Sequence, residues 1–320
     1  MTVIMSPWRP LFDGVGGILH AAGMADEAFG LPGVQRDQRV QVVKIDLTTS
    51  GLGFFTTPLD PTSKYQTRNA TIFDFLAAYP QVKLAINASL AEGDDDGNAT
   101  LFGLCKSEGN LVCDPTVPAP QPKPTSEPDV RNDADTGTIA LTITRDNQAS
   151  FAIINAQSPT WLPPNSRLIE HSPWPGVYTA IAGSPNSYDW PPKPFVTGAL
   201  KPGEAMTLRG GVNNGNPRFS GPSPVAGRTA VGLDAAARNL FLMTIDGIEG
   251  QPYGANFYDT GEWLKLAGAT DGINLDGGGS TAMAVNIGGA SLLMNVPHGT
   301  EGPPYLQRAN AQFFGVTLSG

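Results

Sequence analysis

An apolar segment of the 320-residue sequence ends in a carboxylate that three consecutive glycines follow, in the run NLDGGGST at residues 274–281. Three glycines in a row lose more backbone entropy on folding than an ordinary turn requires. They leave backbone N–H groups uncovered and let a ligand approach the main chain, with Asp276 fixed at the end of the strand. We therefore expect the triglycine loop, defined as residues 276–281, to form part of a ligand site.

Two common functions of glycine-rich loops do not fit this run. A phosphate-binding P-loop has a lysine before its Ser or Thr, but here Gly279 precedes Ser280 directly. The nucleophile elbow of serine hydrolases needs a second glycine where Ala282 stands. The structural alternative is a tight turn between two strands at residues 273–275 and 281–285, for which one or two glycines would be enough.

Three segments around this loop have the order and spacing of a known family. They are GRTAVGLD at 227–234, LMTIDG at 242–247 and the NLDGGGST run itself, with a helix-like segment at 257–267 before the last. In these blocks the sequence resembles the phosphodiester glycosidase family. The resemblance extends from about residue 40 to the C-terminus and is dense over residues 227–285.

Three further segments are similar to the family. KLAINAS at 83–89 resembles a strand that ends in Asn-Gly-Gly, but Ala88 and Ser89 replace the two glycines. AIAG at 180–183 resembles a central glycine strand, and QRAN at 307–310 resembles a C-terminal strand that contains an arginine. The replaced glycines leave open how closely Asn87 approaches a ligand.

The resemblance implies hydrolysis of a sugar 1-phosphodiester at the anomeric carbon, which releases a free sugar and a phosphomonoester. Because phosphate leaves more readily than an alkoxide, a strong general acid becomes less important than in most glycosidases. The site instead needs a cation for the phosphate, a base or nucleophile for the anomeric carbon, and hydrogen bonds to the sugar.

We expect three residues to carry this chemistry. Arg228 can grip two phosphate oxygens, although a salt bridge to Asp234 or Asp276 is an alternative role. Asp276 is expected to be the base or nucleophile, and Asp246, at the end of the preceding apolar strand, the second carboxylate. Asp246 can instead cap its own turn. Which carboxylate attacks, and whether configuration is retained, depends on the distance between them.

The other candidate residues are expected to bind the substrate through hydrogen bonds or charge. They are Asn87, Gly183, Thr229, Gly277, Gly278, Gly279, Ser280, Thr281 and Arg308. Tyr188 and Trp190, in a segment rich in aromatic residues and prolines, can stack on a sugar ring or simply pack a loop.

Composition limits the classes of function. Hydrophobic residues make up 40% of the chain, enough for a real core, and 38 Gly and 29 Pro indicate many turns and long connections. A net charge of −9 argues against a nucleic-acid partner, because such proteins need a basic face. No apolar stretch has the length of a membrane span, and residues 1–10 lack the pattern of a secretory signal. Localisation and oligomeric state stay open.

Two other classes of function compete with the glycosidase. One is a metal-dependent phosphodiesterase, but His20, His171 and His298 stand apart from the Asp-rich segments, and we expect no cofactor to be required. The other is a carbohydrate-binding module with an inactive site, which the loss of glycine at Ala88 and Ser89 favours.

Two local features have open structural roles. A structural calcium at the acidic turn of residues 94–98 is left open, although the turn lacks the rest of an EF-hand loop. Cys105 and Cys113 flank a Gly-Asn turn, and they form either a disulfide or two buried thiols.

For the architecture we expect an α+β fold: a single domain with a central mixed, largely antiparallel β-sheet flanked by a few helices and long Gly/Pro-rich loops. Residues 1–38 are predicted to be an N-terminal extension with small amphipathic pieces, and residues 39–320 the catalytic domain. The hairpin of residues 229–233 and 240–245 is almost entirely apolar, which predicts central strands buried on both faces. The other predicted strands are 40–47, 52–57, 83–87, 138–144 and 150–155. Residues 115–135 lack periodicity and are predicted to be an exposed excursion.

Two helices are predicted. Residues 74–79 gather aromatic and aliphatic side chains on one face before a proline. The second helix is predicted to begin at Asp259, which caps it while Glu262 reaches back. Trp263 then faces the core and Gly268 ends the helix.

Overall fold

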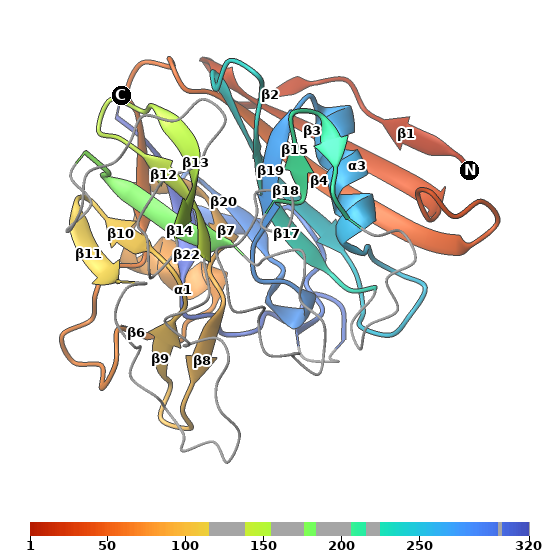
Figure 1. The fold of residues 1–320 in the computed structure, drawn as a ribbon. Helices are drawn as coiled ribbons and strands as arrows, with labels where there is room; N and C mark the ends of the chain where they lie inside the picture. Colours follow the sequence, from red (N-terminus) through yellow and green to blue (C-terminus); the bar gives the residue numbers. More distant parts are fainter. Residues whose placement is uncertain (115–137, 155–175, 184–205, 216–224, 300–302, 320) are drawn as a thin grey trace.

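The computed structural model describes residues 1–114, 138–154, 176–183, 206–215, 225–299 and 303–319. In this part of the chain, four β-sheets enclose the apolar core, and the helices lie on outer faces of two of them (Figure 1). The predicted excursion at 115–135 lies outside the described residues, and so do Tyr188 and Trp190.

The largest sheet has nine strands and carries the motif segments. Its strands are β1 (Val3–Met5), β2 (Arg9–Phe12), β3 (Val15–Glu27), β4 (Gln35–Asp46), β15 (Leu208–Arg209), β16 (Val212–Asn213), β17 (Arg228–Leu233), β18 (Asn239–Asp246) and β19 (Asp271–Asn274). They lie in the order β1-β3-β4-β18-β17-β19-β15-β16, and β2 pairs with β3. Strands β18, β17 and β19 therefore stand side by side near the middle of the sheet.

Three smaller sheets complete the β structure. The first has the order β21 (Ala290–Leu293), β20 (Met283–Ile287), β7 (Val82–Asn87), β22 (Phe313–Leu318) and β5 (Leu52–Thr56). The second runs β11 (Asn110–Cys113), β10 (Cys105–Ser107), β14 (Thr179–Gly183), β12 (Thr138–Ile143) and β13 (Ala149–Ile154). The third runs β6 (Thr67–Arg68), β9 (Asn98–Leu101) and β8 (Ala91–Gly93).

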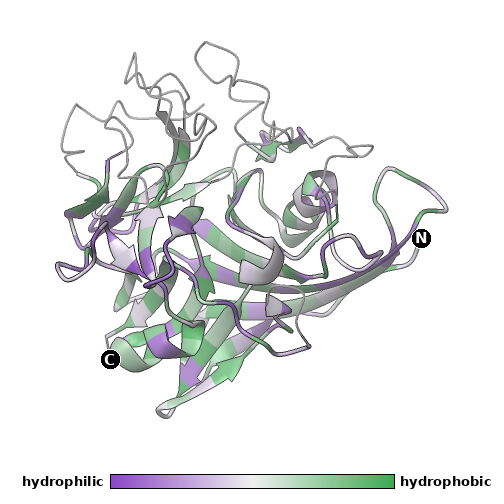
Figure 2. Cartoon of the chain, turned by 90° about the horizontal axis from the view of Figure 1, so that it is seen from below, coloured by the Kyte–Doolittle hydropathy of each residue, from purple (hydrophilic) through white to green (hydrophobic). Residues whose placement is uncertain are grey.

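The central hairpin is buried on both faces, as its apolar sequence predicts. Val231 of β17 and Leu242 of β18 belong to the main core, which all three larger sheets share. Phe241 and Met243, which alternate with Leu242 along β18, join Trp263 in a second core on the opposite face. In Figure 2, apolar (green) bands alternate with paler and hydrophilic (purple) bands along many strands. Both faces of the strands that lead to the site are therefore fixed by packing.

The helices are short, and both begin at capping boxes. Helix α3 (Phe257–Ala267) is capped by Asn256, whose side chain accepts the N–H of Asp259 while the Asp259 carboxylate accepts the N–H of Asn256. The predicted cap at Asp259 is therefore wrong by three residues, because Asp259 is the reciprocal N3 partner. Gly268 ends α3 in a left-handed conformation, as predicted. Helix α1 (Ile72–Ala78) covers the sheet that contains β7.

The predicted α+β class is wrong. The described chain is mostly strand, with α1 and α3 as its two α-helices, and every ladder in its four sheets is antiparallel rather than mixed. The physical reason is that the inner face of the large sheet packs mainly on other sheets, so few helices are needed to cover it.

The first 38 residues contribute to the largest sheet. Strand β3 pairs along β4, and β4 pairs along β18, so the chain before residue 39 is joined to the central hairpin by continuous ladders. Strand β4 itself crosses the boundary expected after residue 38. None of the described helices has both the length and the apolar character that a membrane crossing requires.

Trp263 anchors α3 to the large sheet, and its replacement tests this packing. The indole is 0% exposed and donates from Nε1 to Gln38 Oε1 at 2.9 Å. Trp263→Ala should lower the free energy of unfolding by about 3–5 kcal/mol, because it leaves a cavity and an unpaired amide oxygen. Leu266→Ala, on the exposed face of the same helix, should lower it by less than about 1 kcal/mol. Urea unfolding followed by circular dichroism compares the two, and equal losses would contradict this anchoring role.

Candidate active site

The triglycine loop carries the chain from one sheet to another. It leaves β19 in the large sheet, forms a 3-10 turn over Gly278–Ser280, and enters β20 in a different sheet. The loop therefore makes a tight turn between two strands, as the structural alternative expected, but β19 and β20 are not paired and do not form a hairpin. Gly278 adopts a φ of 61°, and a Cβ atom on Gly277 would lie 2.8 Å from the carbonyl oxygen of Gly227. Both positions need glycine for steric reasons.

Most amides of the loop are turned inward. Gly277 N–H donates to its neighbour's carboxylate, Asp276 Oδ1, at 3.0 Å, and Gly278 N–H donates to Gly227 O at 2.8 Å. The N–H groups of Ser280 and Thr281 bond to carbonyls within the loop at 3.2 Å each. Within the described chain, only the Gly279 N–H of residues 277–281 has no acceptor. The loop thus offers a substrate fewer backbone donors than its sequence suggested.

Asn87 ties the two ends of the triglycine loop together. Its Nδ2 donates to Asp276 O at 2.7 Å, and its Oδ1 accepts the N–H of Ala282 at 3.0 Å. The Thr229 hydroxyl donates to the same Oδ1 at 2.6 Å. Asn87 is 1% exposed and Thr229 is fully buried. The geometry therefore gives these two expected substrate-binding residues a positioning role.

The residues that replace the family glycines are packed into the interior. Ala88 is 1% exposed, and its carbonyl accepts the N–H of Asp276 at 2.9 Å. Ser89 is also buried, and its hydroxyl accepts the N–H of Ala182 in β14 at 2.8 Å. The Ser89 side chain links the segment after β7 to β14, and the main chain of Ala88 supports Asp276, so the two replacements do not by themselves argue for a dead site.

The Asp276 carboxyl lies in a partly desolvated and positively charged environment. Burial raises its pKa, while the Ser280 hydroxyl, the charge of Arg308, the Gly277 N–H and the charge of Arg228 act in the opposite direction. Arg308 is itself exposed and precedes β22. The structure therefore brings both expected cations within electrostatic reach of Asp276.

Arg228 stands between the triglycine loop and the start of α3. Its Nε donates to Ala255 O at 2.9 Å, and its guanidinium carbon lies 4.7 Å from the centre of the Phe257 ring. Its Nη1 lies 3.7 Å from where a Cβ of Gly277 would be. Burial lowers the pKa of Arg228 to about 10 against the attraction of nearby carboxylates. A guanidinium so placed remains charged at neutral pH.

The Asp246 carboxylate holds a neighbouring segment in place. Its Oδ1 accepts Asn295 Nδ2 at 3.0 Å and Val296 N–H at 2.9 Å, so it does not cap its own turn. Asn295 also donates to Thr281 O at 3.3 Å and accepts the N–H of Met283 at 2.7 Å. Asp246 therefore supports the far end of the triglycine loop through Asn295. No sequence signal pointed to Asn295, a single amide after a short strand.

Gly183 and Thr281 complete the set of expected residues. A Cβ on Gly183 would lie 2.8 Å from Asn274 O, so glycine permits the close approach of β14 to β19. The Thr281 hydroxyl is buried, and it has no hydrogen-bond partner among the described residues. The structure thus brings together the triglycine loop, Asp276, Arg228 and Arg308. Asp246 and Gly183 do not join this group: Asp246 supports the loop through Asn295, and Gly183 lets β14 approach β19.

The polar groups considered for metal binding have other partners. Within the described ranges, no cluster of three or more His, Cys, Asp or Glu residues could hold a metal ion. In the acidic turn, Asp94 accepts the N–H of Asn98 at 2.9 Å and pairs with Lys64 at 3.8 Å.

Of the two states expected for the cysteines, the structure has the pair of buried thiols. Cys105 and Cys113 are directly opposed across β10 and β11, and both are free.

The site thus combines one carboxylate with arginines at the junction of antiparallel sheets, an arrangement typical of enzymes that act on anionic substrates. Residues 184–317 match the family model for phosphodiester glycosidase, which confirms the resemblance that the motifs indicated. This range includes the triglycine loop, Arg228 and Arg308. The family implies glycosidase-type hydrolysis of phosphodiesters.

Solved structures with a similar fold include a zebrafish enzyme. It is the catalytic domain of N-acetylglucosamine-1-phosphodiester alpha-N-acetylglucosaminidase, auto-inhibited by its pro-peptide, with a TM-score of 0.63, 17% identity, and coverage of 100% of this chain and 89% of that one. A Burkholderia pseudomallei protein has a TM-score of 0.53 at 15% identity, covering 91% and 76%. A hypothetical Synechocystis protein has a TM-score of 0.50 at 17% identity, covering 95% and 62%. No curated protein matches the sequence.

The buried Asp246 carboxyl should make stability depend on pH. Burial raises its folded-state pKa from 3.8 to about 6, so the folded protein binds this proton more tightly than the unfolded chain. The resulting stabilisation, about 3 kcal/mol, is fully present below about pH 4 and is lost as pH rises through about 6. Urea unfolding at pH 4 to 7 should show this loss in the wild type and not in Asp246→Asn. Asp13→Asn, on an exposed turn, controls for the removal of one charge. If the free energy of unfolding of Asp246→Asn falls with pH as steeply as that of the wild type, Asp246 is not the group responsible.

The hydrogen bonds of Asn87 can be tested separately from its size. Asn87→Leu should lower the free energy of unfolding by about 3 kcal/mol, because its three hydrogen bonds are lost and their largely buried partners are left unsatisfied. Asn286→Leu is the comparison, because Asn286 is a buried amide in β20, the strand that pairs with β7. It should lower the free energy of unfolding by about 1 kcal/mol. Thermal unfolding at fixed pH gives both values. A loss for Asn87→Leu no greater than for Asn286→Leu would show that the loop does not depend on this amide.

Proposed function

We propose that this protein is a hydrolase that cleaves sugar 1-phosphodiesters at the anomeric C–O bond and releases a free sugar and a phosphomonoester. The observation that carries the proposal is the position of Asp276. Its main chain is held by Asn87 at the end of β7 and by Ala88, which follows, and its carboxyl lies within electrostatic reach of Arg228 and Arg308. An acid so placed can act on a carbon whose leaving group is a phosphate.

In the proposed reaction, Asp276 and Arg228 act on the substrate, and Asp246 and Asn87 position the loop. Asp276 acts as a carboxylate, either taking a proton from the attacking water or attacking the anomeric carbon itself. As the C–O bond breaks, its electron pair stays on the phosphate oxygen. Arg228 neutralises that developing charge with a planar pair of donors. Asp246 supports the loop through Asn295, and Asn87 sets the direction of Asp276.

Partial desolvation supports the choice of Asp276. Burial raises the pKa of its carboxyl, which makes the carboxylate a stronger base, while the charges of Arg308 and Arg228 act in the opposite direction and favour the ionised form. The family match supports glycosyl phosphodiesters as the substrate class. A sugar with a simple aryl or methyl phosphodiester at its anomeric carbon is the natural first substrate to assay.

Replacement of the carboxyl should abolish turnover and leave the fold intact. Asp276→Asn preserves the size of the side chain but removes the base, and it should lower kcat at least about a thousandfold. Asp271→Asn is the control, because Asp271 begins β19 and Asp276 follows the end of that strand; this variant should keep near-normal kcat. Product sugar released from an aryl glycosyl phosphodiester is the measurement, with circular dichroism to check folding.

The competing classes give different outcomes in the same assay. Turnover that disappears after chelation would favour a metal-dependent phosphodiesterase, and near-normal turnover by Asp276→Asn would remove this residue from the mechanism. Binding of the diester by the wild type without any product would favour an inactive carbohydrate-binding module.

A further inference from the structure

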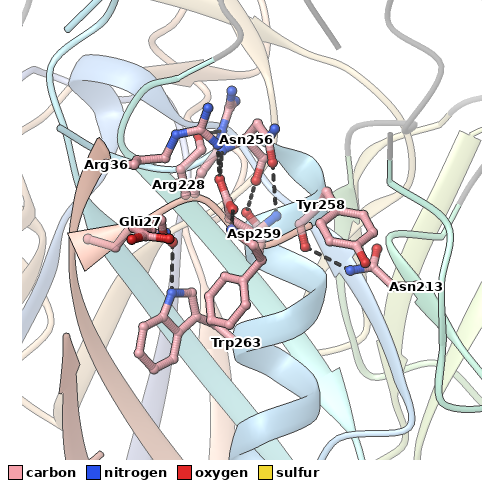
Figure 3. Close-up of polar contacts among 12 residues, drawn as sticks. Glu27, Arg36, Asn213, Arg228, Asn256, Tyr258, Asp259 and Trp263 are labelled. Atoms are coloured by element: carbon pink, nitrogen blue, oxygen red, sulfur yellow. Dashed lines mark hydrogen bonds and ion pairs between the residues drawn. The ribbon is translucent and has the colours of Figure 1, made fainter. Parts of the chain in front are cut away.

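A second arginine, to which no sequence motif pointed, lies beside Arg228. Arg36 of β4 forms an ion pair with Asp259 of α3 (Figure 3). Arg36 is 7% exposed and Asp259 is 0% exposed, so the pair is almost completely removed from solvent. Figure 3 shows the guanidinium groups of Arg36 and Arg228 close together above Asp259. Their mutual repulsion helps to lower the pKa of Arg228, although burial is the main cause.

Two buried guanidiniums at one place require negative charge nearby. Asp259 supplies one, but its carboxylate also accepts the N–H groups of Phe29 at 2.9 Å and Asn256 at 3.0 Å. Glu249 and Asp276 also attract Arg228, and Glu249 is exposed, so water screens its charge. An anion bound beside Arg36 would take a further part in this compensation.

Arg36 keeps donors available for such a ligand. A guanidinium has five N–H groups in a planar fork. The only hydrogen bond of Arg36 to another described residue runs from Nη1 to Asp259 Oδ2. The ion pair therefore holds the side chain in one orientation and leaves most of its donors unused. Helix α3 also begins here, and its positive end favours an anion.

We propose that Arg36 and Arg228 form an anion clamp that binds the phosphate of the substrate, with Asp259 as the residue that orients Arg36. The identity of the anion as the substrate's phosphate rests on the function proposed above. Arg228 reaches both the start of α3 and the triglycine loop, so a phosphate in the clamp would lie near Asp276. The unused donors of Arg36 can hold phosphate oxygens in a planar fork, and the nearby charge of Arg228 adds attraction for the same anion.

Inorganic phosphate is the direct probe of this clamp. Isothermal titration at low ionic strength should show phosphate binding to the wild type, and Arg36→Gln should weaken it about tenfold or more. Arg238→Gln is the matched control, because it removes the same charge from an exposed pair with Asp46. The control should bind phosphate like the wild type. Equal affinities for Arg36→Gln and Arg238→Gln, or no binding by the wild type, would overturn the clamp.

A double variant separates the clamp from a purely structural ion pair. Arg36→Gln alone leaves Asp259 buried without its partner, and this can disturb the fold. Arg36→Gln with Asp259→Asn removes both charges, keeps the shape of residue 259 and places a shorter amide at residue 36. If Arg36 binds the anion, the double variant still binds phosphate about tenfold more weakly. If Arg36 only neutralises Asp259, the double variant recovers wild-type affinity, and the proposal is wrong.

Kinetics distinguish failure of the clamp from failure of the proposed function. With an aryl glycosyl phosphodiester, Arg36→Gln should lower kcat/KM about tenfold, and Arg238→Gln should not. Hydrolysis that is equal in the two variants would contradict the clamp and leave the function standing. Absence of hydrolysis in the wild type, with phosphate binding that still depends on Arg36, would contradict the function and leave the clamp standing.

Discussion

The site depends on one interaction, the set of hydrogen bonds through which Asn87 holds both ends of the triglycine loop. A loop that passes from one sheet to another gains no support from a ladder along its own length. Here a single carboxamide contacts the residue before the glycines and the residue after the turn, and Thr229 fixes that carboxamide in turn. Asn87, Thr229 and Ala282 are buried and Asp276 is partly buried, so these bonds compete little with water. The direction in which Asp276 points follows from this arrangement.

Several charged side chains near the triglycine loop are buried away from water. Arg36, Asp259 and Asp246 are each less than a tenth exposed, and each carries a specific partner. Buried charges are costly unless they are paired or hydrogen-bonded, and they interact more strongly there than at the surface. The net charge of −9 makes a local concentration of arginines more significant, because the chain as a whole repels anions. The arginines at the start of α3 and the loop would attract the anionic substrate proposed above.

The antiparallel sheets explain how such a site can be stable without many helices. The main core is shared by strands from three sheets, and α3 and α1 cover outer faces only. Helix α3 has a second task, because its first turn carries Asp259 and packs Phe257 against Arg228. The similar folds of the zebrafish, Burkholderia and Synechocystis proteins, at 15–17% identity, show that very different sequences support this architecture.

The sequence alone determined the local features. The apolar runs of β17 and β18 indicated strands buried on both faces, Gly268 marked the end of α3, and the glycines after Asp276 indicated a loop with special steric needs. The motif blocks also indicated the family, because short-range order and spacing survive in the sequence. Only the tertiary structure decided that sheets cover sheets, that most amides of the triglycine loop turn inward, and that Asn87 and Asp246 support the site from behind. It also brought Arg36 beside Arg228, across nearly 200 residues of sequence. Contacts between distant segments depend on the packing of whole sheets, and no local pattern of residue types records them.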